Sequence, residues 1–293
     1  MSGNTAPNIS PKEKLRAVTD KITSLPTLPK VITEITSLMQ NPRTSAEEVG
    51  RAITMDQALA SKVLRLVNSA FYGFPGRINT ITHAIVILGF NTVKNIVLTA
   101  SVFDKLGGHG EQDGFNLEKF WMHSIGTGVI AKEIAKKVNF RFHEESFLAG
   151  LLHDIGKIIL FKFLPEEFAS VQAILQKEDI LILDAEKRAL DLTHNEIGSW
   201  LSQRWNLPED LRAAILYHHA PVLANQHKTM VSVVHAADVL TRALGIGSGG
   251  DKKIPVLSSD VWDELKFSRQ LVDKIYKDIE PEMDKSTIFF QIM

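Results

Sequence analysis

A histidine and an aspartate, His153 and Asp154, are adjacent within the apolar segment 151–157 (LLHDIGK). Imidazole nitrogens and carboxylate oxygens both bind divalent transition metals. A buried carboxylate without a partner is costly, and a nearby cation removes that cost. The segment therefore predicts a metal-binding position inside what otherwise has the pattern of a protein core.

Other side chains that could bind the same metal occupy helical positions where apolar residues would be expected. They are His123, His194, His218, His219, His235 and Asp238. A single buried histidine is usually a hydrogen-bonded core residue, but a set of this size can hold one or two ions. Because the chain has no cysteine, any metal must be bound by histidine and carboxylate side chains. Such ligands suit iron, manganese or zinc, and without thiolates a paired site favours iron or manganese.

Composition predicts a folded, soluble protein. The 293 residues are 44% hydrophobic, which is enough for a substantial core. The 33 basic and 34 acidic residues nearly balance, so no general attraction to nucleic acid or to a membrane surface is expected. The first ten residues do not resemble a secretory signal, and no apolar run approaches the ~20 residues needed to span a bilayer. With no cysteine present, these features favour a cytoplasmic protein.

Helical periodicity dominates the rest of the chain. Apolar residues recur at three- and four-residue spacing, and no strand-like alternation or hairpin turn is evident, so the fold class is predicted to be all-α. Helices are expected at 11–24, 30–39, from 45 onward, 56–69, 80–106 as two helices meeting at Gly89, 117–138, 142–163, 165–176, 183–190, 193–205, 208–217, 230–244 and in two closing segments. The apolar end, 286–293, could dock on the body, cover a partner or mark a truncation.

The glycine-rich segment 107–110 (GGHG) is the best candidate for an internal boundary. A division near residue 112 gives four parts. These are a polar segment with a first helix at 1–20, a helical subdomain at 21–112, a second helical subdomain at 113–245 that carries the candidate metal ligands, and a loop with closing helices at 246–293.

Several segments of the first half resemble the HDOD family, the HD-related output domain of bacterial signalling proteins. They are 25–29 (LPTLP), 41–42 (NP), 53–59, 64–70 (LRLVNSA), 72–73 (YG) and 84–89 (AIVILG). The second half resembles the HD superfamily of metal-dependent phosphohydrolases, and the order of its histidines and aspartates is similar to that of the HD-GYP branch. The resemblance covers roughly residues 20–245. It implies an N-terminal helical subdomain packed on an HD-type helical bundle.

The resemblance also implies how the ligands are shared. One metal would be held by His123, His153, Asp154 and Asp238, and a second by His194, His218 and His219, with Asp154 bridging both. A carboxylate can span two cations whereas an imidazole cannot. Lys157 would contact either a substrate phosphate or the bridging carboxylate, although it could equally be a surface lysine. In an enzyme, Asp154 and Lys157 would be the catalytic candidates, and His235 would support the ligands from behind.

One departure from the HD-GYP pattern follows the last histidine pair. Where an HD-GYP enzyme continues with an acidic residue and Gly-Tyr-Pro, this chain has Ala220-Pro221-Val222. Two functions are therefore expected. The preferred one is a signalling output module that binds a protein partner and retains a metal site. The alternative is a metal-dependent phosphohydrolase or phosphodiesterase that acts on a nucleotide, a cyclic nucleotide or another phosphate-containing ligand.

Overall fold

The computed structural model describes residue 27, residues 30–41, residues 43–112 and residues 114–292. The helix expected at 11–24 lies outside the described residues. Within them, helices make up almost the whole fold, which confirms the all-α class. No helix in this part of the chain combines the length and the hydropathy needed to cross a lipid bilayer.

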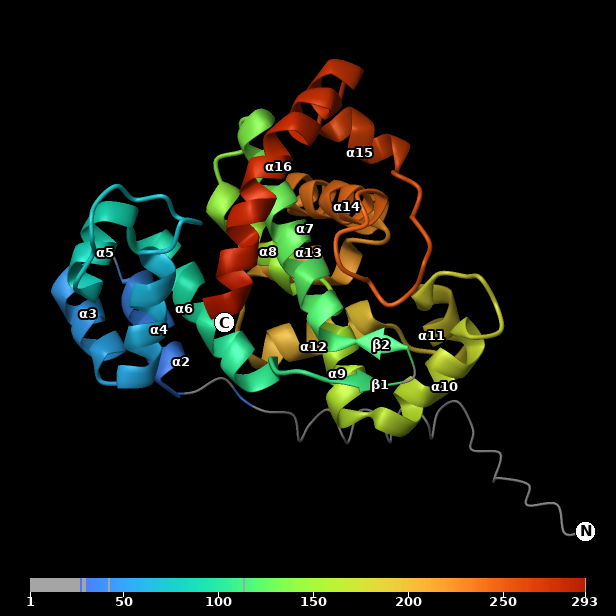
Figure 1. The fold of residues 1–293 in the computed structure, drawn as a ribbon, viewed down its shortest axis with the longest axis horizontal. Coiled ribbons are helices and arrows are strands. Elements are labelled where there is room, and N and C mark those ends of the chain that lie inside the picture. The colour runs from blue at the N-terminus through green and yellow to red at the C-terminus, as the bar shows by residue number, and fades with distance from the viewer. Residues whose placement is uncertain (1–26, 28–29, 42, 113, 293) are drawn as a thin grey trace, which may run out of the picture.

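The first four helices that the structure describes form a separate group, blue to cyan at the left of Figure 1. They are α2 (Lys30–Gln40), α3 (Ala46–Thr54), α4 (Gln57–Val67) and α5 (Ile81–Leu88). Side-chain caps fix where they begin: Ser45 and Glu48 form a capping box at α3, and Asp56 accepts a hydrogen bond from the Leu59 amide at α4. The apolar faces of these short helices turn toward one another and form the core of the group.

Helix α6 (Phe90–Leu106) connects this group to the larger bundle (Figure 1). Gly89 separates α5 from α6 with φ of 83°, a conformation that favours glycine. The expected pair of helices meeting at Gly89 is therefore confirmed. After α6, the candidate boundary segment leads into a short antiparallel pair, β1 (Glu111–Gln112) and β2 (Phe115–Asn116). The sequence pattern did not reveal this pair, because two-residue strands are too short to show alternation.

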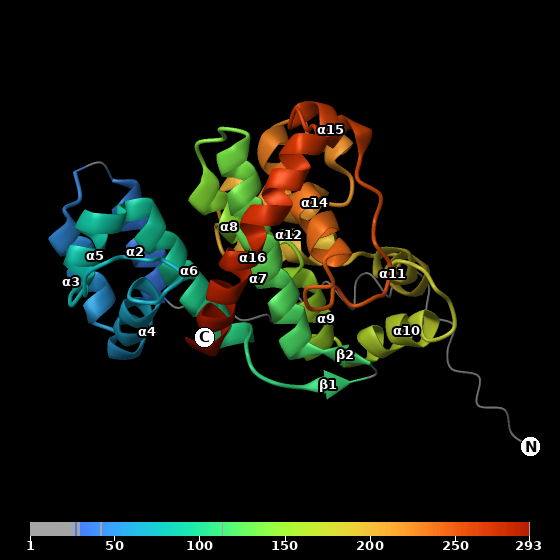
Figure 2. The ribbon, with the colours of Figure 1, turned by 45° about the horizontal axis from the view of Figure 1, so that its top comes forward.

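The larger bundle contains the remaining helices. They are α7 (Leu117–Lys137), α8 (His143–Leu152), α9 (Ile155–Phe163), α10 (Pro165–Leu175), α11 (Ile182–Leu190), α12 (His194–Arg204), α13 (Glu209–Tyr217), the 3-10 turn η1 (Pro221–Leu223), α14 (Lys228–Ala243), α15 (Ser259–Glu264) and α16 (Arg269–Ile292). Helix α7 lies at the centre and packs against α8, α14 and α16 (Figure 2).

The single helix expected at 142–163 is two helices in the structure. Helix α8 ends at Leu152 and α9 begins at Ile155, so His153 and Asp154 occupy the break between them. The apolar pattern continues through the break because both helices are buried, which is why periodicity did not reveal it. The break allows the side chains of His153 and Asp154 to face the other candidate metal ligands inside the protein.

The last turns of α16 dock on the body of the protein, one of the three alternatives left open by the sequence. Phe289 is fully buried, and its ring centroid lies 5.0 Å from that of Phe71 and 5.6 Å from that of Phe147. Phe71 follows α4 and Phe147 belongs to α8, so the C-terminal helix joins the N-terminal group to the larger bundle.

Candidate metal centre

Backbone carbonyls aim two of the candidate ligands. His153 Nδ1 donates to the Gly150 carbonyl at 2.6 Å, and His218 Nδ1 donates to the Ile215 carbonyl at 2.9 Å. Each bond places the proton on Nδ1 and leaves Nε2 as the nitrogen that can bind a metal. Both carbonyls lie one turn earlier on α8 or α13, so the helix that carries each histidine also fixes the orientation of its ring.

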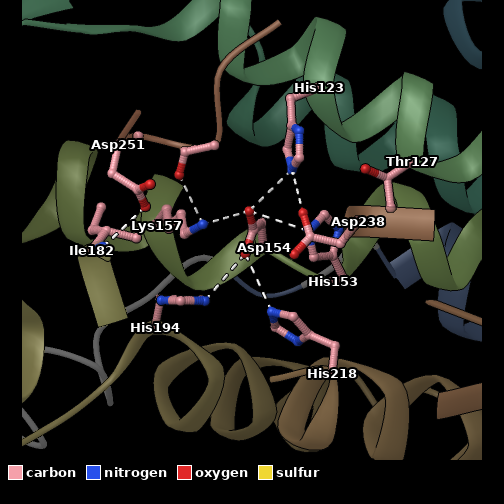
Figure 3. Close-up of polar contacts among 12 residues, drawn as sticks. His123, Thr127, His153, Asp154, Lys157, Ile182, His194, His218, Asp238 and Asp251 are labelled. Carbon is pink, nitrogen blue, oxygen red and sulfur yellow. Dashed lines mark hydrogen bonds and ion pairs between the residues drawn. The ribbon is translucent and has the colours of Figure 1, made fainter. Parts of the chain in front are cut away.

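The first group of ligands surrounds one oxygen of Asp154. His123 from α7, His153 and Asp238 from α14 form a cluster whose candidate ligand atoms all lie within 4.8 Å of one another. The distance from His123 Nε2 to Asp238 Oδ1 is 3.2 Å. Asp154 Oδ2 lies 3.5 Å from His123 Nε2 and 3.2 Å from His153 Nε2 (Figure 3).

The second group surrounds the other oxygen of the same carboxylate. Asp154 Oδ1 lies 3.1 Å from His194 Nε2 and 3.5 Å from His218 Nε2. His219 completes this group, with its Nε2 atom 3.1 Å from His194 Nε2. Figure 3 shows the Asp154 carboxylate between the two sets of histidines. Its two oxygens therefore face separate ligand groups, as a bridging carboxylate would.

Burial without hydrogen bonds indicates that these residues fit metal ions. His123, His153, Asp154, His194 and His218 are fully buried. The buried atoms that make no hydrogen bond include His123 Nε2, His153 Nε2, Asp154 Oδ1 and His218 Nε2. Buried polar atoms are almost always hydrogen-bonded, so four exceptions that converge on one space need a partner. A divalent cation in each group would provide it.

Lys157 lies fully inside the protein, so the surface position allowed for it was wrong. Its ammonium group donates to Asp154 Oδ2 at 2.6 Å and to the Gly249 carbonyl at 2.8 Å (Figure 3). This places Lys157 behind the bridging carboxylate, one of the two positions expected for it. Gly249 belongs to the loop between α14 and α15 (residues 244–258), here called the α14–α15 loop.

Three charged residues around the centre were missed from the sequence. Glu186 on α11 accepts a hydrogen bond from His194 Nδ1 at 2.7 Å. Arg242 donates through Nε to Asp238 Oδ1 at 3.2 Å and through Nη1 to Asp251 Oδ1 at 2.9 Å. Arg242 lies one helical turn after Asp238, a spacing that could have been noticed. Glu186 lies only eight residues before His194 but in a different helix, and Asp251 is brought in by the α14–α15 loop, so neither carried a periodic signal.

His235 supports the centre from behind, as expected. Its Nδ1 donates to the His218 carbonyl at 2.7 Å, and its Nε2 accepts a hydrogen bond from the Ser258 amide at 3.1 Å. The ring therefore connects the backbone beside His219 to the end of the α14–α15 loop, and its nitrogens are both occupied. His235 belongs to neither ligand group.

A model of the HDOD domain matches residues 25–221, which is more than half of the chain. The chain belongs to the HDOD domain family. The matched region includes His123 through His219, whereas Asp238 lies beyond it. The resemblance to the HDOD family noted in the sequence is thereby confirmed.

Known proteins are similar in sequence or structure to this HDOD chain over most of its length. An uncharacterized protein from Treponema pallidum (strain Nichols) is 28% identical over 230 residues, covering 78% of this chain but only 44% of the longer relative. An HDOD domain protein of unknown function from Geobacter sulfurreducens has a TM-score of 0.79 at 26% identity, with 93% of this chain and 96% of that chain covered. A candidate phosphohydrolase from Shewanella amazonensis SB2B has a TM-score of 0.73 at 25% identity, with 93% and 97% covered.

Charge within the centre separates the histidines of this HDOD protein by protonation state. Burial lowers the pKa of His153, but the Asp154 and Asp238 carboxylates together outweigh burial and raise that pKa to about 9. Burial lowers the pKa of His218 to about 4, despite its contact with Asp154. Burial likewise holds the pKa of His219 well below its usual range. At neutral pH and without metal, His153 is therefore protonated while His218 and His219 are neutral.

Metal binding is expected to release a proton from His153 and, below the raised pKa of His194, from His194 too, because only the neutral imidazole binds a cation. Below pH 9 the affinity for Mn²⁺ should therefore rise at least about tenfold for each pH unit and level off above it. Titration of the metal-free protein with Mn²⁺ between pH 6.5 and 9.5 measures this slope. The variant His83→Gln, which alters an exposed histidine on α5, should keep the same slope. An affinity that does not change with pH would contradict the assignment of His153.

The close approach of α9 to α12 makes Gly156 sensitive to any side chain. A Cβ atom at this position would lie 1.9 Å from the His194 carbonyl oxygen and 2.9 Å from the Gly198 amide nitrogen. Gly156→Ala should therefore destabilise the protein by about 3 kcal/mol, since backbone cannot move aside as a flexible side chain can. Urea unfolding measures the loss. The control is Gly110→Ala, whose Cβ would meet nothing closer than 3.7 Å. Equal unfolding midpoints for the two variants would show that α9 and α12 are not in contact.

Proposed function

We propose that this HDOD protein is a signal-transduction output module that acts by binding a protein partner and carries an HD-type centre for two divalent metals. The observation that carries the proposal is a complete but enclosed ligand set. Of its seven members, His219 alone keeps partial exposure; Asp238 is 2% exposed and the others are fully buried. Enclosed metals support a conformation more readily than they meet a substrate.

The seven candidate ligands divide into two groups, one for each ion. His123, His153 and Asp238 would hold the first, His194, His218 and His219 the second, and Asp154 both. Nitrogen and oxygen donors without thiolate favour iron or manganese. When bound, the pair would neutralise the buried carboxylates and could lower the pKa of a coordinated water. Lys157 and Arg242 keep Asp154 and Asp238 ionised: burial raises the pKa of each carboxyl, but the neighbouring cations and histidines hold it well below its usual range.

A metal-dependent phosphohydrolase acting on a nucleotide or cyclic nucleotide is the second candidate. The partial exposure of His219 favours it, because the second group is the side from which a phosphate could approach. The name of the Shewanella amazonensis structural relative points the same way. Against it, Lys157 is bonded to Asp154 and to Gly249 and is not free to meet a substrate. The segment after His219 also lacks Gly-Tyr-Pro.

A phosphate-ester hydrolysis assay distinguishes the two proposed functions. Protein loaded with Fe²⁺ or Mn²⁺ would be incubated with cyclic di-GMP, nucleoside triphosphates and bis(p-nitrophenyl) phosphate, beside an Asp154→Ala control. The output-module function predicts no hydrolysis above the rate of the control. Hydrolysis that depends on Asp154 would overturn that function in favour of the phosphohydrolase. A cytoplasmic location remains part of the proposal, supported by a chain without cysteine. The absence of a nucleic-acid partner also remains part of it, supported by a net charge of −1.

A further inference from the structure

A groove of about 1000 Å³ lies on the outer side of the α14–α15 loop. Its opposite wall is the segment between α10 and α11 (residues 176–181), here called the α10–α11 segment. Figure 1 shows the loop after α14 descending beside α11 before it returns to α15. None of the seven candidate metal ligands lines this groove, so it is a separate site.

Most charges in the groove are already paired with one another or with a neighbour. The pairs are Lys253 Nζ with Asp179 Oδ2 at 2.5 Å, Arg188 Nη1 with Glu178 Oε2 at 2.7 Å, and Arg242 Nη1 with Asp251 Oδ1 at 2.9 Å. These pairs account for every carboxylate that lines the groove. No acidic lining residue is left to attract a cation.

Two cations in the groove remain without a counter-ion. Lys177 and Lys252 line opposite walls, both are exposed, and neither forms an ion pair with any residue that the structure describes. Three lysines and three carboxylates line the groove, and these two lysines are left unpaired because arginines outside the lining pair with Glu178 and Asp251. Paired lysines on facing walls suit an anion such as a phosphate group.

Uncharged residues of the groove could contact the organic part of a phosphorylated ligand. Leu175, Ile180 and Ile254 line it, and Ile254 is 56% exposed despite its apolar side chain. The groove thus combines two unpaired cations with an apolar wall.

The inner side of the same loop contacts the metal centre. Gly249 accepts a hydrogen bond from Lys157, which also donates to Asp154. Asp251 accepts a hydrogen bond from Arg242, which also donates to Asp238. Gly247, with φ of 65°, lies so close to α7 that a Cβ there would come within 2.3 Å of the His123 amide nitrogen. Any ligand that moves the loop would change the contacts behind both metal-binding carboxylates.

We infer that this groove binds a phosphorylated organic molecule of the nucleotide class and that the α14–α15 loop links its occupancy to the metal centre. Lys177 and Lys252 bind the phosphates, and the apolar wall packs against the organic part of the ligand. The binding site does not depend on the proposed function, whereas the link to the metal centre rests on it.

Calorimetric titration of the metal-loaded, full-length protein with ATP and with GTP tests the site. At least one should bind saturably, while adenosine and guanosine should not. Lys177→Glu/Lys252→Glu should lower the affinity about tenfold or more, since each lost charge-assisted contact is worth roughly that factor. The control Lys277→Glu alters an exposed lysine on α16 and should have no effect. No binding of either nucleotide, or binding that the double variant leaves unchanged, would overturn the site. Pyrophosphate binding as tightly as the nucleotides would overturn the role of the apolar wall.

Asp154→Ala tests the link and separates it from the metal centre itself. The variant should still bind the nucleotide, with an affinity changed about fivefold, because coupling between two sites is reciprocal and of that size or larger. An unchanged affinity would overturn the link. Complete loss of binding in Asp154→Ala, with the double lysine variant unaffected, would place the nucleotide at the metal centre and overturn the groove as its site.

Discussion

Asp154→Ala is expected to remove the metal from both ligand groups, because this one carboxylate faces both. Its Oδ1 and Oδ2 atoms lie 3.1 Å and 3.2 Å from the nearest histidine nitrogens of the two groups. Loss of a residue that only orients a ligand lowers metal affinity by ~10- to 100-fold, so loss of the shared ligand should cost at least ~100-fold for each ion. Elemental analysis of dialysed protein measures the change.

Two further variants make this result interpretable. Asp184→Ala, which removes an exposed carboxylate from α11, should leave the metal content unchanged. Asp154→Asn preserves the volume of the side chain and guards against loss of the fold, since Asp154→Ala leaves the buried Lys157 ammonium without its partner. Full metal content in both Asp154 variants would rule out a bridging role for this residue.

Removal of the metal is expected to lower the melting temperature by about 10 °C. A ligand that binds only the folded state at 1,000 times its dissociation constant stabilises it by ~4 kcal/mol. One kcal/mol shifts the melting temperature by ~2–4 °C in a domain of this size class. The metal would also satisfy the four buried atoms that otherwise lack a hydrogen bond. Thermal unfolding with and without a chelator measures the shift.

His153→Ala should reproduce part of that shift and lower the metal content in parallel. His83→Ala, on the exposed face of α5, is the matched control and should change neither. A chelator should then lower the melting temperature of His83→Ala as much as that of the unaltered protein. Equal melting temperatures with and without chelator would show that the metal does not support the fold.

Local sequence patterns predicted most of the helices but not the break at the centre of the site. Caps such as Asp56 and apolar spacing determine α4 within a few residues, so its place could be predicted. The break between α8 and α9 is set by the approach of Gly156 to α12, a contact between segments about 40 residues apart. A continuous apolar run hides such a break, because burial on all sides removes the periodic signal.

The ligand set could be predicted because the family order of histidines and aspartates is visible in the chain, whereas the groups around it could not. Lys157 is as compatible with a surface as with a core position until the α14–α15 loop covers it. Glu186 reaches His194 across the short connection between α11 and α12, eight residues along the chain. Arg242 had a local signal, its one-turn spacing from Asp238, but its second partner Asp251 lies in the loop. Long-range packing thus decides which charges surround the ligands.

Anomalous diffraction from crystals loaded with Mn²⁺ tests the central claim most directly, because it locates each ion without reference to activity. Two peaks are predicted, one between His123, His153 and Asp238 and the other between His194, His218 and His219, with Asp154 contacting both. Crystals in which neither ligand group holds a peak would contradict the metal centre, and a peak at a single group without Asp154 would contradict the bridge.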